Sequence, residues 1–169
     1  YISTDCGLTF THPADKGLPT YPTRIEVSPV NPDYMVVDDD HIANTGSYAN
    51  QTYYSHDGGN TWTVAGRDTS LSITPFNARS NGYAWSPTDQ NLCLSFGGDM
   101  ILRSTDGGKN FVWSNSGFGA ASVTDISYNL NNPSLMATTN QDYKGFISKD
   151  FGRTWEYVNA WSDNRWGGY

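Results

Sequence analysis

One eight-residue pattern occurs four times in this chain of 169 residues, and it constrains the fold more than any other feature. Its common form is S-x-D-x-G-x-[TN]-[FW]. The four copies begin with serines at positions 3, 55, 104 and 148 and end at Phe10, Trp62, Phe111 and Trp155. The serines are 52, 49 and 44 residues apart, so the chain is a series of similar units of about that length.

Each copy of the pattern predicts a tight hairpin. The aspartate carboxylate can accept hydrogen bonds from amides inside the turn, and the glycine supplies a positive φ. The terminal aromatic residue then starts the return strand and packs into the core. We therefore interpret Asp5, Asp57, Asp106 and Asp150 as structural turn residues rather than ligand contacts.

A second pattern lies between the hairpins and completes the repeating unit. It is an alternating strand that runs into a Pro or Asn turn, at residues 25–29, 83–87 and 126–129. Another apolar strand follows each turn, at residues 34–37, 92–94 and 135–137. Each unit is thus predicted to have four strands, named A to D in chain order, with the eight-residue motif at the C–D turn.

The motif resembles the Asp box, or bacterial neuraminidase repeat, of sialidases, xyloglucanase-type glycoside hydrolases, sortilin-type receptors and several phage tail proteins. The resemblance implies an all-β fold, a β-propeller of four-stranded antiparallel blades, with about three and a half blades present. We expect a C–D hairpin at residues 1–14, full blades at 23–66, 82–115 and 124–160, and the start of a further loop at 161–169.

That blade count is incomplete for a closed ring. A closed propeller usually has about four to eight blades, and an open one leaves unpaired edges. We therefore expect the chain to associate with the remainder of its own propeller in a longer polypeptide, or with a second copy of itself.

Charge and composition exclude several partners. The formal net charge of −7, without a cluster of Lys and Arg, argues against nucleic acid. No run of about 18 apolar residues is present, which argues against membrane insertion. Cys6 and Cys93 have no Cys or His neighbours at ligand spacing, and the three histidines fit no metal motif. We expect no metal and no cofactor, and interpret both cysteines as ordinary small residues.

The expected binding surface is the end of the blades opposite the Asp boxes. Because antiparallel strands alternate in direction, the A–B turns share one end with the Asp boxes, and the B–C and D–A loops lie at the other. We call this other end the upper face. Its longest B–C loop is expected at residues 38–50 and begins with Asp38, Asp39 and Asp40. These aspartates could act as an acid or base or bind a hard cation. The alternative is a solvated acidic loop without a function in binding.

Charged candidates for chemistry gather at the expected mouth of the central channel. Alignment of the repeats places Arg24, Gly82 and Asp125 at the start of the innermost strand A, where charged residues either contact a ligand or form a salt bridge. Two carboxylates about 6 to 9 Å apart would suit an inverting glycosidase. The catalytic candidates are Asp39, Asp99, Asp125 and Asp142.

Aromatic side chains supply a second kind of candidate site, because flat rings stack on the apolar faces of sugars while polar neighbours bond the hydroxyls. The densest group lies at residues 161–166, and packing between blades is its alternative role. The ligand-binding candidates are Arg24, Tyr48, Trp161, Asp163, Arg165 and Trp166.

Function is narrowed by what the chain lacks and by the style of its repeats. Sialidases need three arginines, a tyrosine nucleophile and a glutamate, whereas the two glutamates here, Glu26 and Glu156, lie inside expected strands. Xyloglucanase-type hydrolases fit better, since their blades pair a Pro-Asn turn with an Asp box. The resemblance implies part of a secreted, extracellular glycoside hydrolase acting on polysaccharide. The alternative is a non-enzymatic propeller of a cell surface or virion that binds glycan or protein.

Overall fold

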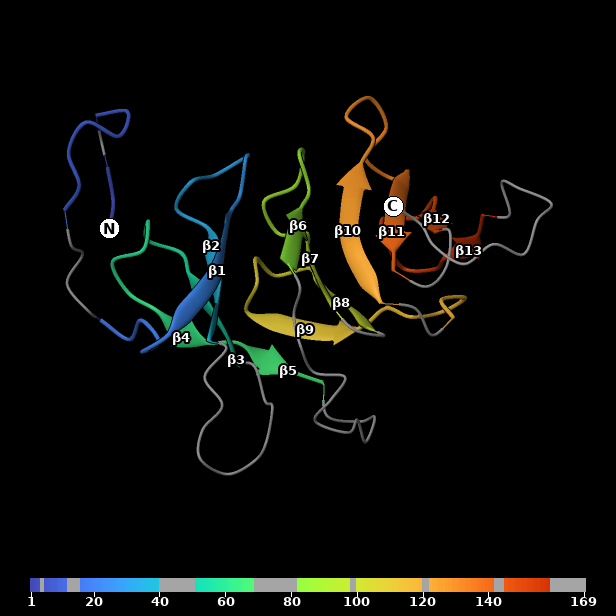
Figure 1. The fold of residues 1–169 in the computed structure, drawn as a ribbon, viewed down its shortest axis with the longest axis horizontal. Helices are drawn as coiled ribbons and strands as arrows, with labels where there is room; N and C mark the ends of the chain where they lie inside the picture. The colour runs from blue at the N-terminus through green and yellow to red at the C-terminus, as the bar shows by residue number, and fades with distance from the viewer. Residues whose placement is uncertain are drawn as a thin grey trace.

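The fold consists of strands and turns throughout the part of the chain that the computed structural model describes, residues 1–3, 5–11, 16–39, 51–68, 82–97, 100–119, 122–141 and 145–158. Most of the strands form three four-stranded antiparallel meanders, which lie side by side in chain order (Figure 1). We call them blades 1, 2 and 3. This arrangement confirms the predicted all-β, propeller-type fold. Within these ranges no helix is long and apolar enough to cross a bilayer.

In every blade, strands that follow one another in sequence are also neighbours in the sheet. Blade 1 contains β1 (Pro22–Val27), β2 (Met35–Asp39), β3 (Gln51–Ser55) and β4 (Thr63–Val64). Blade 2 contains β6 (Gly82–Trp85), β7 (Cys93–Gly97), β8 (Met100–Ser104) and β9 (Asn110–Trp113). Blade 3 contains β10 (Val123–Tyr128), β11 (Met136–Asn140), β12 (Phe146–Ser148) and β13 (Glu156–Tyr157). These correspond to strands A to D.

The chain that leaves strand D of blade 1 and of blade 2 pairs with the next blade, which the sequence did not predict. Strand β5 (Gly66–Arg67) follows blade 1 but pairs in parallel with β9 of blade 2. Ser116, after blade 2, forms a parallel bridge with Thr154 of blade 3. The amide of Trp62 likewise donates to the carbonyl of Lys16 at 2.8 Å. Main-chain hydrogen bonds therefore link successive units.

The A–B turns and the Asp boxes lie at the same end of the blades, as predicted. In each blade an Asp-box amide donates to a carbonyl of the A–B turn. The pairs are Gly58 to Asp33 at 3.1 Å, Gly107 to Asn91 at 3.0 Å and Phe151 to Ser134 at 3.2 Å. The opposite ends of the strands define the upper face.

Among the described residues, the hydrophobic core forms two clusters, each lying between adjacent blades. Between blades 1 and 2 it contains Val36, Tyr83, Trp85, Cys93, Met100, Leu102 and Phe111. Between blades 2 and 3 it contains Ala84, Leu94, Phe96, Ile101, Val123, Ile126, Met136, Phe146 and Trp155. Burial of each large side chain contributes about 1.5–3 kcal/mol, so face-to-face packing holds the blades together. The A strands also contact one another, β1 with β6 and β6 with β10.

Both cysteines are free thiols. Cys93 is completely buried between blades 1 and 2, where it acts as a small apolar residue. Cys6 is exposed in the first Asp-box hairpin, which is closed by an antiparallel bridge between Ile2 and Thr11.

Candidate functional site

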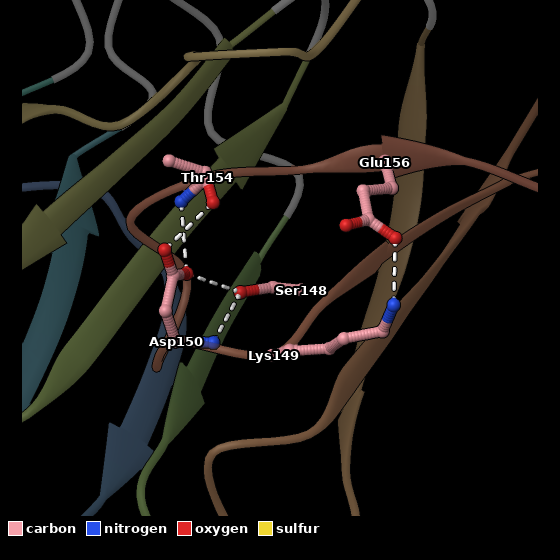
Figure 2. Close-up of polar contacts among 5 residues, drawn as sticks. All are labelled: Ser148, Lys149, Asp150, Thr154 and Glu156. Atoms are coloured by element: carbon pink, nitrogen blue, oxygen red, sulfur yellow. Dashed lines mark hydrogen bonds and ion pairs between the residues drawn. The ribbon is translucent and has the colours of Figure 1, made fainter.

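The Asp-box carboxylates are used inside their own turns. In blade 3 the Ser148 hydroxyl donates to Asp150 Oδ1 at 2.9 Å, and the Thr154 amide and hydroxyl donate to Oδ1 and Oδ2 at 2.9 and 2.6 Å (Figure 2). The other three boxes repeat this arrangement around Asp5, Asp57 and Asp106. Both carboxylate oxygens therefore already have donors, at the end of the blade opposite the upper face.

An exposed ion pair accompanies the box of blade 3. Lys149 Nζ lies 2.7 Å from Glu156 Oε2, and both side chains are largely in solvent (Figure 2). Exposed pairs of this kind stabilise a protein by at most about 1 kcal/mol. Glu156 therefore lies in a strand, β13, as the sequence predicted, and its side chain has a surface role.

Because of the hydrogen bonds within the boxes, we expect the stability of the fold to decrease at low pH. They lower the pKa of Asp5 and of Asp57 from 3.8 to about 2, with the Thr9 and Thr61 hydroxyls as the largest causes. Because the folded-state pKa is depressed, this stabilisation is complete above about pH 4 and is lost as the pH falls through about 2. We expect the urea midpoint to fall steadily between those values, as measured by circular dichroism.

Asp57→Asn provides the control for this acid dependence. The amide keeps an acceptor oxygen but has no charge to titrate, so its urea midpoint should depend less on pH than that of the unmodified chain. Equal pH dependence in the two proteins would show that the box carboxylates are not responsible.

At the upper face, strand register places Arg24, Gly82 and Asp125 at equivalent positions. They pair with Asp38, Phe96 and Thr139, respectively. A register shift directly precedes this position in both β1 and β10. Arg24 is half-buried, whereas Asp125 is exposed and accepts a long 3.4 Å hydrogen bond from the Ser127 hydroxyl. Asp125 therefore has carboxylate oxygen available to a ligand in solution.

The expectation of an acidic loop beginning at residue 38 is wrong, because β2 continues through Asp38 and Asp39. Asp38 is completely buried, and its Oδ1 accepts hydrogen bonds from the Tyr83 hydroxyl and, at 3.4 Å, from the Thr52 hydroxyl. The hydroxyl oxygens of Thr52 and Tyr83 also lie 2.9 Å apart. Strand alternation turns Asp38 toward blade 2, so it is an interblade hydrogen-bond acceptor rather than a solvated acid.

Burial and the Asp38 charge shift the pKa of a residue in blade 2, Tyr83, and of a residue in the link between the blades, Arg67. Burial, followed by the Asp38 charge, raises the pKa of Tyr83 well above its ordinary value, so the phenol remains protonated as a donor. Burial lowers the pKa of Arg67 in β5, and the Asp38 charge partly opposes that shift. No local sequence pattern indicates the roles of Tyr83 and Thr52, because both residues are distant from Asp38 along the chain.

Removal of the Tyr83 hydroxyl should test this contact. A hydrogen bond to a charged group contributes about 1.5–3 kcal/mol, so Tyr83→Phe is expected to lower the free energy of unfolding by that amount. Tyr53→Phe is the matched control, because the Tyr53 hydroxyl donates to Gln51 Oε1 in an exposed pair. Urea unfolding at neutral pH measures both variants, and equal losses would argue against a special role for the buried phenol.

The structure describes only some of the remaining candidate residues. Asp39 is half-buried at the end of β2, beside the strand that carries Arg24, and its charge adds to burial in raising the pKa of Tyr53. Asp125 belongs to blade 3, so blade 2 lies between it and Asp39 along the chain. The other candidates lie outside the described residues: Asp40, Tyr48, Asp99, Asp142, Trp161, Asp163, Arg165 and Trp166.

Arg24 borders a groove of about 430 Å³ between the first hairpin and blade 1. The lining is mainly apolar and includes Ile2, Leu18, Ile25, Val27, Met35 and Trp62. Within the described ranges, no three His, Cys, Asp or Glu side chains form a group that could hold a metal ion.

The fold and the boxes together define an Asp-box β-propeller. The BNR/Asp-box repeat model matches residues 53–64 and 146–157, which contain the boxes of blades 1 and 3. Two similar solved structures are an ancestral GH74 enzyme (TM-score 0.62, 15% identity) and the GH74 enzyme of Niastella koreensis (0.61, 15%). A third is YCF48 from Cyanidioschyzon merolae (0.60, 20%). At these identities the likeness shows the fold.

The chain corresponds to only part of each of these proteins. The matches cover 82–83% of this chain, but 18% of the ancestral enzyme, 22% of the Niastella enzyme and 41% of YCF48. No curated protein sequence matches the chain.

Proposed function

We propose that this chain is a segment of a carbohydrate-active β-propeller, part of a secreted glycoside hydrolase that acts on polysaccharide. The observation that carries the proposal is the architecture shared with two GH74 enzymes over 82% of the chain. Those enzymes are several times longer, so the complete activity would require blades beyond these three.

The upper face supplies the chemistry for sugar recognition. The exposed Asp125 carboxylate can accept hydrogen bonds from sugar hydroxyls or act as an acid or base, and Arg24 can donate several. Asp39, on blade 1, supplies a second carboxylate in addition to Asp125. In this proposal Asp99 and Asp142 remain candidates for a catalytic pair, and aromatic contacts come from Tyr48 and the cluster Trp161, Asp163, Arg165 and Trp166.

The alternative is a non-enzymatic glycan-binding or protein-binding propeller of a cell surface or virion, and one observation favours it. At the channel-mouth position, blade 2 carries Gly82 between Arg24 of blade 1 and Asp125 of blade 3. The middle blade thus contributes no acid at that position, whereas an inverting hydrolase needs two carboxylates facing one another.

Electrophoresis of the chain through gels containing xyloglucan tests the proposal, together with an assay for released reducing ends. We expect retardation, weakened about tenfold or more by Asp125→Asn or Arg24→Ala, because each change removes a charged hydrogen-bonding group. Asp33→Asn is the control, since Asp33 is exposed in an A–B turn at the opposite end of blade 1.

The outcomes separate the two functions. Retardation with release of reducing ends would support the hydrolase. Retardation without release, from the full-length protein with its further blades as well as from this chain, would favour the binding module. Absence of retardation with xyloglucan and with a panel of other polysaccharides would overturn the carbohydrate proposal.

A further inference from the structure

Blade 1 presents an apolar face that is open to solvent. Ile25 and Val27 project from β1 and are 59% and 39% exposed. With Met35 of β2 and Trp62 at the end of the Asp box, they line the groove of about 430 Å³. A contiguous apolar surface of this kind on a propeller blade marks an interaction site.

The repeat identifies this surface, because the same positions form the interfaces inside the molecule. By strand register, the equivalents are Tyr83, Trp85, Cys93 and Phe111 in blade 2, and Ile126, Tyr128, Met136 and Trp155 in blade 3. In both blades these side chains face the preceding blade and pack in the core clusters. The face of blade 1 is therefore a blade interface by position as well as by composition.

The box glycines show what such an interface receives. A Cβ on Gly108 would lie 2.5 Å from Val36 Cγ1, and a Cβ on Gly152 would lie 3.1 Å from Leu94 Cδ1. Each glycine thus seats an aliphatic side chain from strand B of the preceding blade. At Gly59 the nearest groups are Met35, Trp62 and Ile2. Among the described residues, none of these comes from a preceding strand B.

Ile2 indicates where strands of a preceding blade would lie. It precedes the box serine of the hairpin at residues 1–11, as Tyr54 precedes the box serine of blade 1, and it reaches Gly59 from that hairpin. Tyr54 similarly lies 3.7 Å from the position of a Cβ on Gly108, beside Val36. The first hairpin therefore already occupies the place of strand C beside blade 1.

We propose that the face of Ile25, Val27, Met35 and Trp62 binds the A–B hairpin of a preceding Asp-box blade in the same polypeptide. That hairpin would seat an aliphatic strand-B side chain on Gly59 and would pair with the hairpin at residues 1–11. This inference is independent of the ligand proposed for the upper face.

A second copy of the chain fits this face less well. Its free surface for such a contact would be the far side of blade 3, where Ser127, Ala137 and Thr139 are exposed. They occupy the register positions of Ala84, Leu94 and Phe96, which pack against blade 3 inside the molecule. Polar and small groups there would leave the apolar side chains of blade 1 poorly covered.

The test extends the chain before Tyr1 with a copy of its own residues 82–101, whose strand B carries a leucine. We expect a monomer with a higher urea midpoint than the original chain. Val27→Asp should raise the unfolding equilibrium constant about a hundredfold or more in the extended chain, because it buries an unpaired carboxylate, but change it little in the original. Val112→Asp, at a site 50% exposed on β9, should have a small effect in both.

Near-ultraviolet circular dichroism, which reports on buried tryptophans such as Trp155, confirms that each protein is folded. An unchanged midpoint and an equal effect of Val27→Asp in both folded proteins would overturn the proposal. So would a dimer of the original chain in sedimentation that Val27→Asp dissociates, since the occupant would then be a second copy.

Residues 82–101 as a free peptide give a second test that does not require the extended chain to fold. The peptide should displace the dye ANS from the original chain, but not from an Ile25→Asp variant. Failure to displace the dye from the original chain would contradict the proposal.

Discussion

Replacement of Trp155 by alanine is expected to lower the free energy of unfolding by about 3–5 kcal/mol. The indole is 3% exposed and lies in the core cluster between blades 2 and 3. Its Nε1 donates to the Ser114 carbonyl at 2.9 Å, and its amide donates to the Ser116 carbonyl at 2.8 Å. The side-chain truncation therefore leaves a cavity and an unsatisfied carbonyl at the same interface.

Phe10→Ala is the matched control, because Phe10 occupies the same box position in the first hairpin but is 63% exposed. A substitution at such an exposed site should cost about 0.5 kcal/mol or less. Urea unfolding followed by circular dichroism measures both variants. Comparable losses would mean that the box aromatic stabilises its own hairpin rather than the interface between blades.

The repeat could predict the fold because its signals are local. A serine, an aspartate and a glycine at fixed spacing determine one turn, as the hydrogen bonds around Asp150 show. The same reasoning missed a second left-handed position. Cys6 and Phe151 follow the box aspartate with φ of 59° and 61°, although neither is glycine. The box tolerates a side chain there, at a cost of about 1–2 kcal/mol.

Contacts between blades could not be read from local patterns. Whether residues 38 and 39 continue a strand or begin a loop depends on Tyr83, which lies 45 residues away and gives Asp38 a buried hydrogen-bond donor. Strand β5 similarly exists only because β9 offers a parallel partner. The charged position at the start of strand A was accessible to sequence reasoning, since alignment of the repeats alone places Arg24 and Asp125 there.

The candidate catalytic carboxylates come from different parts of the chain. Asp99 and Asp142 belong to expected B–C loops outside the described residues, and Asp39 and Asp125 are carried by different blades. A carboxylate pair depends on distances across the channel, which no pattern along one chain encodes. These assignments therefore remain predictions, of which Asp125→Asn tests the one at Asp125.

Gly117→Ala is expected to cost about 2–5 kcal/mol, because it disrupts the link from blade 2 to blade 3. Gly117 has a φ of 78°, where a side chain costs about 1–2 kcal/mol. Its Cβ would also lie 2.0 Å from the carbonyl oxygen of Trp155, and such overpacking adds about 1–3 kcal/mol. The neighbouring bridge between Ser116 and Thr154 would have to separate to make room.

Gly119→Ala, two residues along the same segment, separates this clash from a general effect of replacing glycine. A Cβ on Gly119 would lie 3.7 Å from the Phe146 ring, an ordinary contact, so this variant should be neutral or stabilise by up to about 1 kcal/mol. Thermal and urea unfolding measure both. A large loss of stability in Gly117→Ala but not in Gly119→Ala would show that the main-chain link, together with the apolar faces, holds successive blades in register. Equal stabilities of the two variants would mean that side-chain packing alone does so.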